Sequence, residues 1–175
     1  MRRAVLVAAC CLAVLAAGCG GDDSSAEAWA DDFCSSIGDW REQVQDAAAE
    51  LAEPATLSEE QLDDSIRQAV AATDDLLADL GELGVPDLEA RDEIEQELDH
   101  LESVLRERAA NARGGIDQPA DSVSEALARL AALSRELSAA AATIELTIDK
   151  LSSLDPAGEL KQALDSSDAC ASLRG

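Results

Sequence analysis

The sequence predicts an all-α protein, and three observations support that prediction. Helix-forming residues dominate the 175-residue chain, whereas aromatic residues make up 2% and tyrosine is absent, so β-sheet has little support. Apolar residues recur at alternating steps of three and four along four long segments. Proline, glycine or a capping motif separates these segments. The pattern is typical of an up-down-up-down four-helix bundle, here with a short fifth helix at the C-terminus.

The first two predicted helices have clear boundaries. The first begins at Ala26 and stops before Pro54, because the residue that precedes a proline avoids the α conformation. The second begins at Ser58, whose hydroxyl caps free N–H groups while Gln61 reaches back, as in a capping box. It ends near Gly84. Both helices carry the spacing of helices that pack nearly parallel to their neighbours.

The remaining predicted helices follow from proline and glycine positions. The third starts at Pro86, since proline is favoured at the first helical position, and stops at the glycine pair 114–115. The fourth opens near Pro119 and is long. It ends at Asp155-Pro156, which we expect to cap and begin the short fifth helix.

The chain opens with a segment that predicts export. Arg2 and Arg3 precede an almost wholly apolar run from Ala4 to Ala17. This combination is typical of a secretory signal peptide. A permanent transmembrane helix is the alternative interpretation, but such a helix needs about 20 residues. The run ends in Leu15-Ala16-Ala17-Gly18-Cys19, which resembles the lipobox of bacterial lipoproteins.

This resemblance implies how the chain is held. In that family the peptide is cut before the cysteine, so residues 1–18 would be removed and Cys19 would carry diacylglycerol. Two or more acyl chains anchor a protein stably. We therefore expect a cell-membrane protein, lipid-anchored on the extracytoplasmic side. Residues 19–25 then form a lipidated tether, and residues 26–175 form a single helical-bundle domain.

The five cysteines of the chain fall into three groups. Cys10 and Cys11 leave with the leader, and Cys19 takes the lipid. Cys34 and Cys170 remain as an even pair in an exported protein, where disulfides persist. The predicted topology brings both to the membrane-proximal end of the bundle, so we expect a disulfide. Two free buried thiols are the alternative.

Composition excludes one class of partner. The formal net charge is −24, and a surface of that sign repels nucleic acid and anionic lipid headgroups. Nucleic-acid binding is therefore not expected. Solvated helix faces account for the acidity, while loose cation binding and a basic partner are the functional alternatives.

The aromatic residues provide the candidate ligand or interface site. Trp29, Phe33 and Trp40 are the only aromatic residues of the chain, and all lie in the first predicted helix. Phe33 and Trp40 fall on its apolar seam, which indicates core packing. Trp29 falls one place off the seam. It packs under the fifth helix, rests at the lipid interface, or helps to form a small apolar pocket against the alanine-rich fourth helix.

Catalytic and metal-binding motifs are not recognisable. His100 is the single histidine, and Glu97 with His100 gives one Glu-x-x-His match where a di-iron site needs two. His100 also falls outside the apolar seam, so we expect it at the surface. We expect no catalytic residue, metal or cofactor. Arg108 falls on the seam of the third helix, and we expect it to extend out of the bundle and pair with a glutamate.

The whole pattern leads to two functional hypotheses. Cys34 after "WADDF" and Cys170 in "DACASL" resemble the placement in uncharacterised small lipid-anchored helical proteins of actinobacteria, which implies no known activity. The first hypothesis is a non-enzymatic binding or scaffold protein of the cell envelope, with the membrane and an envelope protein as partners. The alternative is a binder of a small amphiphilic ligand near the end of the bundle that holds Trp29 and Trp40.

Overall fold

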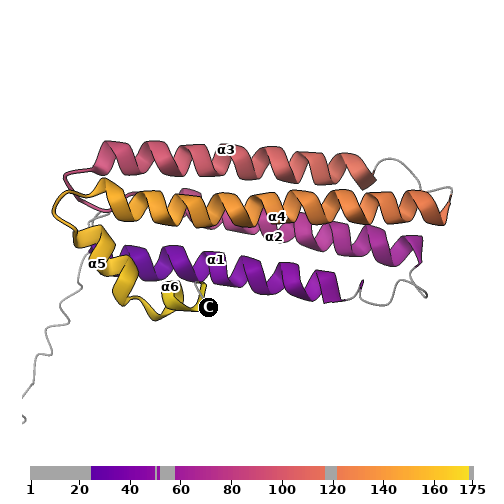
Figure 1. Cartoon of the computed structure of the whole chain (residues 1–175), viewed down its shortest axis with the longest axis horizontal. Coiled ribbons are helices and arrows are strands. Elements are labelled where there is room, and N and C mark those ends of the chain that lie inside the picture. Colours follow the sequence, from indigo (N-terminus) through magenta and orange to yellow (C-terminus); the bar gives the residue numbers. More distant parts are fainter. Residues whose placement is uncertain (1–24, 50, 52–57, 117–121, 174–175) are drawn as a thin grey trace, which may run out of the picture.

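The computed structural model describes residues 25–49, 51, 58–116 and 122–173, and the elements in these ranges are all α-helices. Four long helices lie side by side, and two short ones gather at one end (Figure 1). The all-α prediction is confirmed. The helices are α1 (Ala26–Ala49), α2 (Glu59–Leu83), α3 (Arg91–Ile116), α4 (Val123–Leu154), α5 (Glu159–Ser166) and α6 (Asp168–Leu173).

Two serine caps begin long helices. The predicted capping box is present at α2, where the hydroxyl of Ser58 accepts the N–H of Gln61 at 3.2 Å and Gln61 Oε1 accepts the N–H of Ser58 at 3.0 Å. Ser122 caps α4 in the same way, with its hydroxyl accepting the N–H of Glu125 at 3.3 Å. The start predicted near Pro119 lies outside the described residues.

The predicted boundaries of α3 are wrong at both ends. Pro86 does not begin the helix, because a turn intervenes in which Leu88 donates its N–H to the carbonyl of Pro86 at 2.9 Å. A second bond, from the N–H of Arg91 to the carbonyl of Leu88, leads into α3. The helix then continues through residues 114–115 to Ile116. Glycine weakens a helix by about 1 kcal/mol relative to alanine, which is too little to end it unaided.

The predicted fifth helix is two helices, α5 and α6, with Ser167 between them. The N-cap residue of α5 is Gly158 rather than Asp155. The carboxylate of Asp155 still accepts the N–H of Leu160, in the first turn of α5, at 3.0 Å and that of Ala157 at 3.1 Å. Gly158 has φ 80°, a left-handed conformation that suits glycine, and α5 starts at the next residue.

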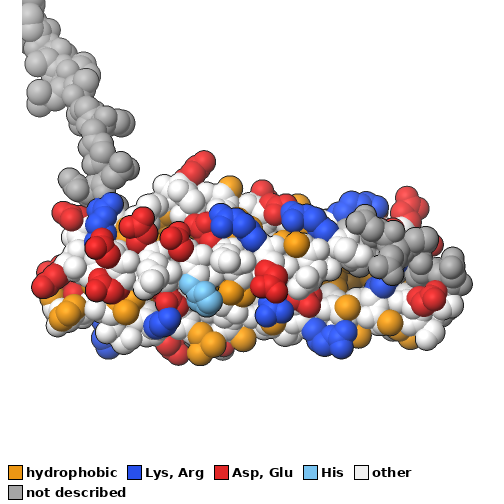
Figure 2. All heavy atoms as spheres, turned by 90° about the horizontal axis from the view of Figure 1, so that it is seen from above, with side chains coloured by type: hydrophobic (Ala, Val, Ile, Leu, Met, Phe, Trp, Pro, Cys, Tyr) orange, Lys and Arg blue, Asp and Glu red, His pale blue; other side chains and the backbone are white. Residues whose placement is uncertain are grey.

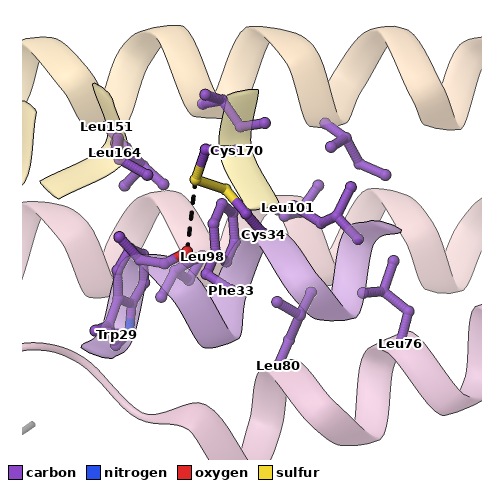
Figure 3. Packing of buried hydrophobic residues seen from close by; sticks show 14 of the residues in the cluster. Trp29, Phe33, Cys34, Leu76, Leu80, Leu98, Leu101, Leu151, Leu164 and Cys170 are labelled. Carbon is purple, nitrogen blue, oxygen red and sulfur yellow. Dashed lines mark hydrogen bonds between the residues drawn. A yellow bond between two sulfur atoms is a disulfide. The ribbon is translucent and has the colours of Figure 1, made fainter. Parts of the chain in front are cut away.

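The buried apolar residues form two clusters along the bundle. The larger one draws on all six helices and contains all the aromatic side chains; Figure 3 shows its centre. The smaller one lies among α1, α2 and α4 and consists of Ala47, Leu51, Leu62, Ile66, Ala69, Val70 and Leu133. Its small and aliphatic side chains bury less area than the aromatic cluster, so most of the hydrophobic stabilisation lies at the α5–α6 end.

Packing of the long helices mainly follows the order of the chain. Helix α1 packs on α2, α2 on α3, and α3 on α4, with a smaller contact between α2 and α4. Helix α5 packs on both α1 and α4, and α6 packs on α1. Ion pairs reinforce three of the long-helix contacts: Arg113–Asp74 joins α3 to α2, Arg129–Asp63 joins α4 to α2, and Lys150–Glu97 and Arg108–Glu136 join α4 to α3. In the described ranges, no Cα atom of α1 lies within 8 Å of a Cα atom of α4.

Candidate functional site

The two predicted partner cysteines are joined. Cys34 of α1 and Cys170 of α6 form a disulfide, with the Sγ atoms 1.96 Å apart and the Cα atoms 5.0 Å apart. Both residues are buried in the larger cluster. The Sγ atom of Cys170 also lies 3.5 Å from the carbonyl oxygen of Ala30, drawn as a dashed line in Figure 3. The disulfide therefore holds α6 against α1, and the alternative of two free thiols is wrong.

Trp29 and Phe33 belong to the core rather than to a binding surface. Both are fully buried, and their rings stack with centroids 4.9 Å apart and planes 10° apart. The indole N–H of Trp29 donates to the carbonyl of Gly84 at 3.0 Å. Neither side chain can contact a ligand without unpacking the core. Two expectations are therefore corrected. These two residues do not form a ligand site, and Trp29 does not rest at the lipid interface.

Trp40 is placed differently from the other two aromatic residues. Its indole N–H donates to Thr73 Oγ1 at 3.2 Å, and the Thr73 hydroxyl donates to the carbonyl of Ala69 at 2.9 Å. This chain of hydrogen bonds satisfies the polar atoms of both side chains and fixes the ring between α1 and α2. The ring of Trp40 also lines a surface groove.

This groove runs between α1 and α4, and no Cα atoms of these two helices lie within 8 Å of each other in the described residues. It has a volume of about 650 Å³, and Leu173 of α6 is part of its lining. Its lining residues define what we call the α1–α4 groove: Ile37, Trp40, Arg41, Val44, Gln45, Leu137, Ser138, Ala141, Ile144, Glu145, Ile148, Asp149 and Leu173.

A second hollow lies next to the α1–α4 groove, on the side of the smaller cluster. It has a volume of about 200 Å³, and Val44 and Leu137 line both hollows. Its lining has no charged residue and includes Ser65 of α2, which is fully buried and whose hydroxyl has no hydrogen-bond partner in the structure. Along α1, the residues that line the two hollows run from Ile37 to Ala48, a span of about 17 Å at 1.5 Å per helical residue.

Charged side chains occupy only one part of the groove's edge. Arg41 of α1 is exposed, and its guanidinium donates to the carbonyl of Leu173 at 3.3 Å. Glu145 and Asp149 are exposed on the α4 side of the same hollow. The groove therefore combines an apolar floor, a charged end beside α6 and an uncharged far end.

The polar residues that the sequence analysis singled out are either exposed or paired with another side chain. His100 is exposed, as predicted, and appears as the pale-blue side chain among mixed acidic and basic groups in Figure 2. Glu97 is buried but forms an ion pair with Lys150 of α4. Arg108 pairs with Glu136 at 3.1 Å, which confirms the predicted glutamate partner. Within the described ranges, no group of three or more His, Cys, Asp or Glu residues is arranged to hold a metal ion.

Sequence reasoning offered a small apolar pocket against the fourth helix as one alternative, but it did not predict the length or the lining of the α1–α4 groove. The apolar stripes of α1 and α4 predict two helices that pack on each other. Neither stripe indicates that the two helices lie apart. The small side chains of residues 138–142 on α4 were the one local signal, since small residues leave space beside a facing helix.

Comparison with protein-family models, with curated proteins and with solved structures finds no match to this chain. Among the described helices, none is both long enough and apolar enough to span a membrane. Cys19 and the rest of the predicted leader and tether lie outside the described residues, apart from Ser25.

Proposed function

We propose that this chain is a non-enzymatic binding protein of the cell envelope, lipid-anchored on the extracytoplasmic side, and that it binds its ligand in the α1–α4 groove. The observation that carries the binding role is that groove, which has a volume of about 650 Å³, is lined in part by Trp40, and lies between two helices whose Cα atoms stay more than 8 Å apart in the described residues. Binding sites of this kind are concave and mostly apolar, with a few polar groups at fixed positions.

The proposed scaffold is an up-down-up-down four-helix bundle, with α5 and α6 across one end. Short connections support this topology, since 84–90 are the only residues between α2 and α3. Packing of α1 on α2, α2 on α3 and α3 on α4 also supports it. The fourth interface of such a bundle, between α1 and α4, is the one that the groove replaces.

The proposed anchor rests on the first nineteen residues. Two arginines, an apolar run and a cysteine after small residues agree with a lipoprotein leader. A membrane fraction that contains the wild-type protein and lacks the Cys19→Ser variant is the expected result. Intact mass should show the wild-type chain cut before Cys19 and carrying acyl groups. A wild-type chain with its leader uncut and a free thiol at Cys19 would contradict the anchor.

The non-enzymatic character is supported by how the buried acids are used. Glu97 is neutralised by Lys150, and Asp155 accepts two backbone N–H groups. A general acid or base needs a free site within reach of a substrate proton. Both carboxylates already have partners that stabilise the fold, so neither is poised for proton transfer.

A pair of neighbouring alanines tests the binding role. Ala141 lines the groove, whereas Ala142 is exposed on α4 outside the groove lining. Ala141→Phe should fill the groove, and Ala142→Phe should leave it open while adding the same ring to the same helix. Native mass spectra of protein purified from membranes should show a non-covalent ligand on the wild type and on Ala142→Phe, and none on Ala141→Phe. Equal adducts on both variants, or none on any protein, would contradict the proposed function.

A protein partner from the envelope is a second candidate function. The supporting observation is the acidic net charge of −24, which favours a basic partner. Such an association would weaken as salt rises, because exposed charges are screened. A complex formed equally at low and high salt would contradict an electrostatic interface.

A further inference from the structure

We propose that the α1–α4 groove takes a single-chain amphiphile with a cationic head, the chain lying along the apolar floor and the head between the carboxylates of Glu145 and Asp149. This inference rests on the proposed function and specifies the chemical class of the ligand. Four properties of the groove lead to it: the covering of its floor, the length of its lining, the position of its charges and their sign.

The floor of the groove is already covered by neighbouring side chains. Ile37, Trp40 and Ile144 keep only 2%, 4% and 3% of their surface exposed. The apolar lining that a ligand can touch includes half-buried side chains, such as Val44 of α1 and Leu137 of α4. A docked helix would need its axis about 8–10 Å from the axes of both α1 and α4. A single hydrocarbon chain needs less space, so it suits a groove with a covered floor better than a peptide helix.

The length and polarity of the groove fit a chain with one polar end. The residues that line the two hollows span about 17 Å along α1. Charged side chains line only the hollow beside α6, and the far hollow is lined by alanine, valine, leucine and serine. An apolar chain is favoured where no charge needs to be desolvated. The chain therefore points toward Leu51, and the head lies beside α6.

The sign of the charges selects the head group. Glu145 and Asp149 are one helical turn apart on α4, and both line the charged hollow. Arg41, the single cation of that lining, donates to the carbonyl of Leu173 and keeps its positive charge, which offsets one of the two carboxylates. The lining is still negative overall, and the net charge of −24 adds to it. A primary or quaternary ammonium is attracted to this end, whereas a carboxylate or sulfate head is repelled.

Three probes with the same dodecyl chain test this assignment. Dodecyltrimethylammonium, dodecyl maltoside and dodecyl sulfate carry a cationic, a neutral and an anionic head, and each would be titrated calorimetrically into the purified protein below its micelle concentration. The cationic probe should bind most tightly and the anionic probe least. Ala141→Phe should weaken binding of the cationic probe at least tenfold, and Ala142→Phe should leave it within twofold of wild type.

Charge removal separates head recognition from chain recognition. The double variant Glu145→Gln/Asp149→Asn should weaken binding of the cationic probe three- to tenfold and leave the maltoside unchanged. The matched control Glu95→Gln/Asp99→Asn removes two exposed carboxylates from α3 and should change neither. An equal effect of both double variants would show that only the net charge acts, and would overturn the proposed head site.

The outcomes distinguish this inference from the proposed function. Binding of dodecyl sulfate as tight as that of the cation, or cation binding unaffected by Ala141→Phe, overturns the inference. If no probe binds while the membrane-purified protein carries a groove-dependent mass adduct, the proposed function stands and the cationic amphiphile is wrong. If neither probes nor adducts depend on Ala141, both are wrong.

Discussion

Removal of the Cys34–Cys170 disulfide tests what holds the bundle closed. The two cysteines are 136 positions apart in sequence, so the disulfide restricts most of the unfolded chain. The chain-entropy relation gives about 5 kcal/mol for a loop of that length, and measured values are commonly 2–4 kcal/mol. For a domain of this size, each kcal/mol corresponds to about 2–4 °C in Tm. We therefore expect Cys34→Ala/Cys170→Ala to lower Tm by about 10 °C.

Adding a reductant distinguishes the stabilisation due to the covalent cross-link from the stabilisation due to packing of the two sulfur atoms. Urea denaturation of wild type and of the double variant would be followed by circular dichroism, with and without reductant. Without reductant, the free energies of unfolding should differ by at least about 2 kcal/mol. With reductant, only the packing difference of two buried side chains should remain. A difference in unfolding free energy between the two proteins that is the same with and without reductant would refute the role of the covalent link. So would a difference below about 1 kcal/mol without reductant.

Three further substitutions test the core, a cap and the groove's support. Leu101→Ala removes a fully buried side chain and should lower the free energy of unfolding by about 2–5 kcal/mol, whereas Leu146→Ala, at a site 69% exposed, should change it by less than about 0.5 kcal/mol. Equal losses would contradict the core assignment. Ser58→Ala should cost about 1 kcal/mol through loss of the α2 cap, and no loss in urea denaturation would contradict that cap. Thr73→Val removes the acceptor of the Trp40 indole and should lower stability by about 1–3 kcal/mol, and an unchanged urea midpoint would contradict that hydrogen bond.

The long helices were predictable because their signals are local. The capping box at Ser58 and the alternating apolar steps need only a few neighbouring residues to act, and the structure has both features. Pro86 misled because its fixed φ also suits a turn, and the chain forms that turn before Arg91. The disulfide was predictable from the two cysteines that remain once the predicted leader and lipid-anchor cysteines are set aside, and from the expected topology.

The site was less predictable because it depends on how far apart two helices lie. Trp29 falls off the seam in a strict heptad, yet it is buried because the carbonyl of Gly84 accepts its indole N–H and Phe33 stacks on its ring. The pocket offered for Trp29 is instead lined by Trp40, which faces the α1–α4 groove. The distance between α1 and α4 depends on three-dimensional packing, since α5 contacts both helices. No residue pattern within one helix encodes that separation.

The indole N–H signals of the two tryptophans give the most direct test of ligand binding in the α1–α4 groove. Trp40 lines the groove, while Trp29 lies in the core outside the groove lining and serves as an internal reference. In a ¹H–¹⁵N spectrum recorded during titration with dodecyltrimethylammonium, we expect the Trp40 indole signal to move and the Trp29 signal to stay in place. A stationary Trp40 signal, or equal movement of both, would contradict a ligand site between α1 and α4.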